Sequence, residues 1–150
     1  MSTISRVTVQ TYQYELDDFG GSMMVYEKGA TLVMTKFVVV VETDDGLRGE
    51  YAPHFGASPS ALAQATEMAP YLIGKDAEHR TKIYEDLKHM FRHFDRVGVA
   101  AIDAALWDLA GKKYRTPISK MLGGYRERIP AYASTFPGQA AGGGLNGPEG

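Results

Sequence analysis

The chain has 150 residues, of which 44% are hydrophobic and 23% charged, the composition of an ordinary globular protein with one main core. Its formal net charge of −2 creates no field that favours a nucleic acid or a membrane surface, and its lack of cysteine excludes disulfides and thiolate catalysis. No stretch has the length and apolarity of a signal peptide or a membrane span, so the sequence predicts a soluble, cytoplasmic protein.

The first half of the sequence predicts a three-stranded antiparallel meander. Ile4–Leu16 is rich in β-branched residues and tyrosine, and Thr31–Thr43 contains the continuous apolar run FVVVV of a strand covered on both faces. The turn Asp44-Asp45-Gly46 connects it to a short third strand, Leu47–Tyr51, because glycine accepts the positive φ of a tight hairpin.

The second half predicts helices. Ser58 and Pro59 begin a helix that reaches about Leu72, and a second helix around Glu78–Phe94 has one apolar stripe, formed by Ile83, Leu87, Met90, Phe91 and Phe94. The third helix, about Val97–Lys113, has two apolar stripes. The first comprises Val99, Ile102, Leu106 and Leu109, and the second comprises Ala100, Ala104, Trp107 and Gly111. A helix apolar on two sides is expected to pack on two sides, against the other helices and against something outside this chain.

A short fourth helix begins at Thr116-Pro117 and ends at Gly123-Gly124, and Ile129–Ser134 is expected to form a short strand before the glycine-rich end. Strands grouped before helices define an α+β domain. The expected organisation is an α+β domain over residues 1–124, followed by the start of a second domain over residues 125–150.

The run VAAIDAALWDLAGKKYRTPISKMLGG, with RIPAYAS after it, resembles the junction in enzymes of the mandelate racemase/muconate lactonizing type of the enolase superfamily. In that family an N-terminal capping domain precedes a catalytic (β/α)8 barrel. A barrel needs about 250 residues, so the resemblance implies that residues 125–150 contain only its start, with Ile129–Ser134 as its first strand.

The resemblance also implies a chemistry. Family members remove the proton next to a carboxylate, and Mg2+ stabilises the resulting enediolate. The full protein is thus expected to be a racemase, cycloisomerase or acid-sugar dehydratase acting on a small carboxylate. The metal ligands and the base are expected on later barrel strands, so this chain has no expected catalytic or metal-binding residue and is expected to be inactive alone.

Two capping-domain loops set substrate preference in the family, and they correspond here to Asp17–Ala30 and Ala52–Ala57. The substrate-contacting residues implied by this resemblance are Phe19, Met23, Met24, Tyr26, His54 and Phe55. His54 could donate a hydrogen bond to a substrate hydroxyl or carboxylate. The alternatives are local packing of the apolar side chains and a solvent-facing His54.

Other constellations favour structural roles. His89 and His93 have i, i+4 spacing but no nearby third ligand, which favours a solvated face over a zinc site. Asp103 and Asp108, five residues apart on a helix, point in different directions and cannot act on one small substrate together.

A second class of function also remains open. A free capping domain could be a non-enzymatic binding or assembly module that pairs with a separate barrel or forms a homo-oligomer. The chain could equally be a fragment of a longer protein.

Overall fold

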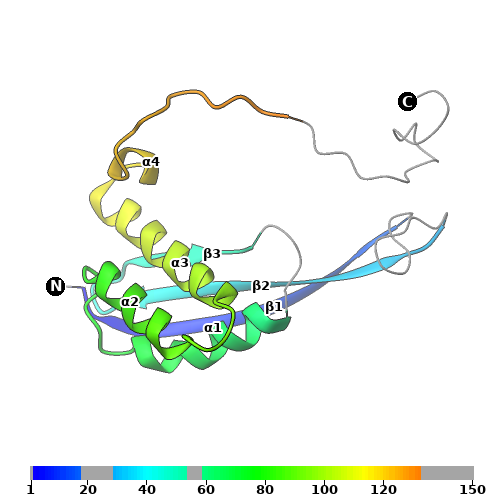
Figure 1. The fold of residues 1–150 in the computed structure, drawn as a ribbon, viewed down its shortest axis with the longest axis horizontal. Coiled ribbons are helices and arrows are strands. Elements are labelled where there is room, and N and C mark those ends of the chain that lie inside the picture. Colours follow the sequence, from blue (N-terminus) through cyan, green and yellow to red (C-terminus); the bar gives the residue numbers. More distant parts are fainter. Residues whose placement is uncertain (1, 18–28, 54–58, 133–150) are drawn as a thin grey trace. The chain divides into compact units, whose positions relative to one another are not determined.

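The computed structural model describes residues 2–17, 29–53 and 59–132. Strands β1 (Ile4–Leu16), β2 (Leu32–Thr43) and β3 (Arg48–Tyr51) form one sheet in the order β1-β2-β3. Helices α1 (Pro59–Leu72), α2 (Arg80–Met90), α3 (Val97–Tyr114) and α4 (Ile118–Met121) follow in chain order (Figure 1). The predicted α+β meander and helical bundle are confirmed.

Contacts divide the chain into two compact units. One unit contains Met1–Tyr12 with Lys36–Tyr125, and the other contains Gln13–Thr35 with Arg126–Gly150. The first unit holds the inner parts of β1 and β2 together with β3 and all four helices.

The core of the first unit lies between the sheet and the helices. The apolar run of β2 is buried as predicted, with Phe37, Val39 and Val41 fully covered. They share one cluster with buried side chains of α1, α2 and α3, among them Met68, Leu87, Ile102 and Leu106. Helix α3 contacts β3, α1 and α2, so it is the element that joins the sheet to the helices.

Two positions require glycine because another backbone segment lies very close to them. A Cβ on Gly98 of α3 would lie 2.4 Å from the Cβ of Gln64 in α1, and a Cβ on Gly49 of β3 would lie 2.1 Å from the backbone oxygen of Ala105. Glycine therefore lets α3 pack against both neighbours at backbone distance.

The β2–β3 turn forms as predicted. Gly46 has φ +82°, and the backbone N–H of Thr43 donates to the oxygen of Leu47 at 3.0 Å. Gly74, at φ +79°, likewise ends the chain reversal after α1. Positive φ strains residues that have a Cβ, which is why glycine is required at both points.

The structure corrects the expected apolar stripe of the second helix. Ile83, Leu87 and Phe91 are buried, but Met90 and Phe94 are 47% and 69% exposed. The helix ends at Met90, so the 3.6-residue periodicity that would bring Phe94 to the core does not continue.

The second stripe of α3 is only partly covered, which agrees with the expectation that it faces something outside this chain. Ala100 is exposed, and Ala104, Trp107 and Gly111 are half-buried. Within the described part of the chain, α3 therefore packs fully on one side only.

The strand expected over residues 129–134 does not form in its described part. Residues 129–132 pair with none of the three strands, and residues 133 and 134 lie outside the described ranges. A β-strand is defined by its hydrogen bonds to a neighbouring strand, so an apolar segment that lacks such hydrogen bonds is not a strand. The first barrel strand thus remains a prediction for a longer protein.

Candidate functional site

The six residues predicted to contact substrate lie outside the described residues. Phe19, Met23, Met24 and Tyr26 fall within 18–28, and His54 and Phe55 fall within 54–58. The structure describes the residues on either side of these two segments, 18–28 and 54–58, together with the contacts that these flanking residues make.

The ends of the first segment are held together in the second unit. The hydroxyl of Thr31 donates to the carboxylate of Asp17 at 3.3 Å, and the side-chain amide of Gln13 donates to the hydroxyl of Thr35 at 3.4 Å. Gly29, at φ +76°, provides the change of direction before β2. Residues 18–28 therefore leave and re-enter the structure at neighbouring points of one hairpin.

The second segment is held at its start by a contact between β3 and α3. The backbone N–H of Glu50 donates to Oδ2 of Asp108 at 2.8 Å, and Lys112 contacts the same Oδ2 at 2.7 Å. Because β3 is an edge strand, a side chain from the helix satisfies a donor that no further strand could accept. Asp108 thus has the structural role predicted for it, close before residues 54–58.

The helix at the end of the second segment is fixed through a buried glutamine. Gln64 of α1 donates from Nε2 to the backbone oxygen and Oδ1 of Asp95, both at 2.9 Å. Its Oε1 accepts the backbone N–H of Gly98 at 2.9 Å. The start of α3 is therefore capped by a side chain from α1, which fixes the two helices to each other.

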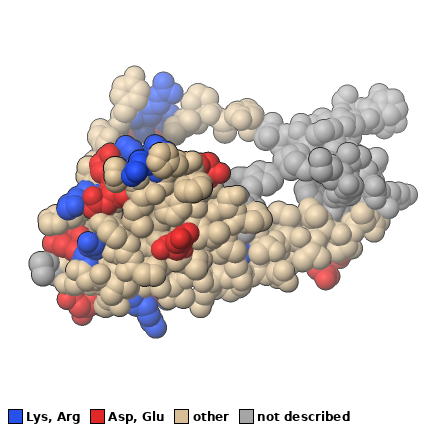
Figure 2. Space-filling view, turned by 60° about the horizontal axis from the view of Figure 1, so that its bottom comes forward, with Lys and Arg blue, Asp and Glu red and all other residues tan. Residues whose placement is uncertain are grey.

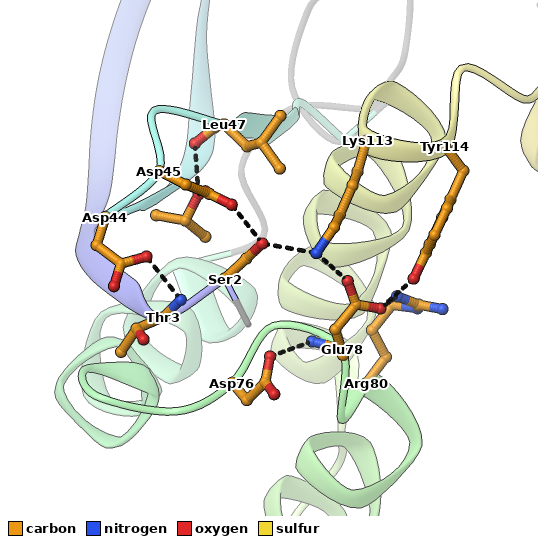
Figure 3. A network of polar contacts seen from close by, with 11 residues as sticks. Ser2, Thr3, Asp44, Asp45, Leu47, Asp76, Glu78, Arg80, Lys113 and Tyr114 are labelled. Atoms are coloured by element: carbon orange, nitrogen blue, oxygen red, sulfur yellow. Dashed lines mark hydrogen bonds and ion pairs between the residues drawn. The ribbon is translucent and has the colours of Figure 1, made fainter.

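A polar network fastens the N-terminus at the other end of α3 (Figure 3). Ser2 donates to Oδ2 of Asp45 at 2.6 Å and accepts from Nζ of Lys113 at 2.7 Å. Lys113 and the hydroxyl of Tyr114 both contact the carboxylate of Glu78. The hydrogen bonds from Lys113 and Tyr114 hold the pKa of Glu78 below its usual range.

Glu78→Gln tests this network through the pH dependence of stability. A carboxyl whose pKa is lower in the folded state contributes stability that is present above its unfolded value of about 4.3 and is lost as pH falls through the folded value. We therefore expect the free energy of unfolding to fall more steeply below about pH 5 in the parent chain than in the variant. Urea unfolding at several pH values measures both slopes.

Equal slopes in the two chains would contradict this role of Glu78. The matched control is Glu67→Gln, which removes an exposed acid from α1 without touching the network. It shows how much of any change comes from the loss of one surface charge alone.

The described residues do not fit a metal site. Within residues 2–17, 29–53 and 59–132, no three His, Cys, Asp or Glu side chains gather as ligands. His89 and His93 are exposed, and Arg92 lies between them, with Nε donating to Nε2 of His93 at 3.0 Å and Nη1 at 3.2 Å from Nε2 of His89. A guanidinium cation beside both imidazoles opposes the binding of a second cation there.

The charges on one face of the described residues are of both signs. On the face in Figure 2, acidic and basic side chains are mixed at one end, and most of the other described surface is uncharged. No helix in the described ranges has the length and apolarity needed to cross a membrane.

Sequence reasoning missed Gln64 and the contact between Asp108 and Glu50. Gly49 could have indicated the contact between β3 and α3, since an isolated glycine within a strand often marks the close approach of another backbone. Gln64 offered no such signal, because its partners are 31 and 34 residues away in the sequence.

Residues 26–123 match the family model of the mandelate racemase/muconate lactonizing enzyme N-terminal domain. The chain is 32% identical over 143 residues to 3,6-anhydro-alpha-L-galactonate cycloisomerase of Streptomyces coelicolor, covering 87% of the chain and 37% of that protein. It is 31% identical over 138 residues to D-galactarolactone cycloisomerase of Agrobacterium fabrum, covering 87% of the chain and 35% of that protein.

A solved structure with the same arrangement is D-glucarate dehydratase of Agrobacterium tumefaciens in complex with magnesium. It has a TM-score of 0.68 and 28% identity, with 89% of this chain and 35% of that chain covered. The chain therefore spans about a third of the length of these relatives.

Proposed function

Because this chain belongs to the mandelate racemase/muconate lactonizing enzyme family of the enolase superfamily, we propose that it is the N-terminal capping domain of a magnesium-dependent enzyme. The substrate class is a sugar acid or its lactone, and the reaction removes the proton on the carbon next to the carboxylate. The observation that carries this proposal is the match of residues 26–123 together with relatives that are sugar-acid cycloisomerases.

The capping domain covers residues 1–124, and the catalytic domain begins at residue 125. We place the magnesium ligands and the base in the part of the enzyme outside this chain, because the chain spans about a third of the length of its relatives. On this proposal the chain alone is inactive.

The role of this chain is to close over the substrate. Phe19, Met23, Met24, Tyr26 and Phe55 form an apolar wall that excludes water, which strengthens the electrostatic interactions inside the site. His54 donates a hydrogen bond to a hydroxyl or carboxylate oxygen of the substrate. The hydrogen bond between Thr31 and Asp17, and those that fix β3 through Glu50 and α1 through Gln64, support this role, because a loop on a rigid base can present side chains at a defined place.

Exchange of the α-proton tests the reaction class. The full-length enzyme is incubated in heavy water with Mg2+ and a panel of sugar acids and their lactones, and the 150-residue chain is treated in parallel. We expect deuterium at the α-carbon with the full-length enzyme only. Exchange by the 150-residue chain would show that the chemistry lies within it, and no exchange by the full-length enzyme would reject the proposed reaction.

His54→Ala in the full-length enzyme tests the contact with substrate. Loss of one hydrogen bond to a polar substrate group is expected to lower kcat/KM by about tenfold or more. Steady-state kinetics measure this loss, and an unchanged kcat/KM would reject the contact. His93→Ala, which removes an exposed histidine outside both segments, is the matched control and should keep the parent value.

A further inference from the structure

The connection between α2 and α3 lies beside a hollow in the surface of the first unit whose lining is mostly basic. This Arg92 hollow has a volume of about 400 Å³, and the residues that line it are Glu85, Asp86, Lys88, His89, Arg92 and Arg96. It contains no residue of the two segments proposed to contact substrate, so its charges need an explanation of their own.

The two acidic side chains of the hollow already have basic partners. Asp86 accepts hydrogen bonds from the hydroxyl of Tyr71 at 2.5 Å and from Nζ of Lys82 at 2.8 Å. Glu85 forms an ion pair with Lys88 at 2.9 Å. The negative charges of the hollow are thus each matched by a lysine, and the charges of the two arginines remain.

Arg92 and Arg96 have no carboxylate partner in the part of the chain that the structure describes. Within residues 2–17, 29–53 and 59–132, neither guanidinium belongs to an ion pair. The acid next to Arg96 in the sequence, Asp95, accepts instead from Nε2 of Gln64 at 2.9 Å. Two guanidinium groups that line one hollow repel each other, and an anion bound between them would replace this repulsion by attraction.

The backbone that carries the two arginines is held in place. Phe91 is buried in the core, and the backbone oxygen of Asp95 also accepts from Gln64 at 2.9 Å. Nη1 of Arg92 lies 3.2 Å from Nε2 of His89, and the ring nitrogen is the acceptor because a guanidinium only donates. A cationic group that is positioned in advance loses less conformational entropy when a ligand binds.

The chemistry of the hollow selects a doubly charged oxyanion. A guanidinium presents parallel N–H groups that match two oxygens of a phosphate or a carboxylate. The two arginines supply two positive charges, which a phosphate group with a charge of about −1.5 to −2 near pH 7 neutralises and a single carboxylate does not. The guanidinium that opposes a metal ion beside His89 therefore favours an anion.

We propose that the Arg92 hollow binds a phosphate group, with Arg92 and Arg96 as the donors. The ligand is free inorganic phosphate or the phosphate of a small organic molecule, and a volume of about 400 Å³ accommodates either. The proposal goes beyond the proposed function and does not depend on it, because none of the lining residues belongs to 18–28 or 54–58.

Titration of the ¹⁵N-labelled 150-residue chain with inorganic phosphate, followed by two-dimensional NMR, tests the site. The pH and the ionic strength are held constant, and sodium chloride at the same ionic strength is the reference for general salt effects. We expect saturable shifts at the amides of residues 88–97 with phosphate only. A parallel titration with glycerol phosphate separates the two sources: tighter binding identifies an organic phosphate, and equal or weaker binding identifies the free ion.

Substitutions of the two arginines connect the shifts to the proposed donors. Arg92→Ala and Arg96→Ala are each expected to weaken phosphate binding by at least about tenfold, because each removes charge-assisted hydrogen bonds. Arg92→Lys keeps the charge but loses the parallel donors, and at least about threefold weaker binding is expected. The matched control is Arg48→Ala, which removes an exposed arginine of β3 outside the hollow and should bind within about twofold of the parent chain.

Circular dichroism checks that each variant is folded, and Arg96→Ala decides alone if Arg92→Ala is not. Shifts that are linear in phosphate, or that chloride reproduces, would overturn the proposal. Binding by the folded alanine variants as tight as that of the parent chain would also overturn it. A full-length enzyme that exchanges no α-proton would reject the proposed reaction and leave the phosphate site unaffected.

Discussion

Replacing Gly49 by alanine is expected to lower the free energy of unfolding by about 3 kcal/mol, near the upper end for overpacking in a core. The added Cβ would lie 2.1 Å from the backbone oxygen of Ala105 and 2.5 Å from the Cβ of Leu109. Both atoms are parts of the α3 backbone or fixed directly to it, so no side-chain rotation relieves the overlap. The strand or the helix must move, and α3 is the element that joins sheet and helices.

Urea unfolding of the 150-residue chain followed by circular dichroism measures this loss. The matched control is Arg48→Ala, at the neighbouring exposed position of the same strand, where a change within about 0.5 kcal/mol is expected. A variant at Gly49 as stable as the parent would show that β3 and α3 are not packed at backbone distance. Strand propensity alone favours alanine over glycine, so the sign of the effect separates packing from propensity.

Replacing Gln64 by leucine is expected to cost about 3 kcal/mol, although leucine is apolar and a good helix former. The side chain is 9% exposed and makes hydrogen bonds to Asp95 and Gly98. Leucine leaves the buried N–H of Gly98 without an acceptor and frees the loop before α3 from its donor. The unpaired buried N–H costs about 1–3 kcal/mol, and each of the two lost hydrogen bonds to Asp95 costs about 0.5–1.5 kcal/mol more.

Hydrogen exchange together with urea unfolding measures the effect at Gln64. We expect loss of protection first at the N-terminal turn of α3, where the cap is removed. Thr66→Ala, an exposed position on the same helix, is the matched control and should change stability by about 0.5 kcal/mol or less. Unchanged protection at Gly98 and Val99 would show that the cap contributes nothing.

Gly49 and Gln64 both lie in elements that flank residues 54–58 in the sequence. Gly49 and Gln64 fix β3 and α1, the two elements that this segment joins. If His54 has the role proposed above, substitution of Gly49 or Gln64 in the proposed full-length enzyme is expected to reduce activity as well as stability. The proposed contacts to substrate themselves lie outside the described residues and stay predictions.

The local chemistry of the chain was enough to predict the order of elements. The Asp44-Asp45-Gly46 hairpin, the helix start at Pro59 and the apolar run of β2 each act over a few residues, and each forms as predicted. The run from Val99 to Gly124 was likewise enough to identify the family, which the match over residues 26–123 confirms.

The extent of burial could not be predicted in the same way. Met90 and Phe94 fit an apolar stripe in the sequence but are exposed: Phe94 lies beyond the end of α2, and Met90 is its last residue. Residues 129–132 have the composition of a strand but no neighbour to pair with. Periodicity records which residues can be buried, whereas burial depends on what lies opposite them.

The sequence by itself determined the order of the three strands and four helices, the α+β class and the family, since these follow from local propensities, turn residues and one specific motif. Only the tertiary structure decided that Gly49 must be glycine, that Gln64 caps a distant helix and that Arg80 has a buried donor without an acceptor among the described residues. The physical reason is distance along the chain: these properties arise where segments tens of residues apart meet, and their free energies depend on the atoms that each segment finds there.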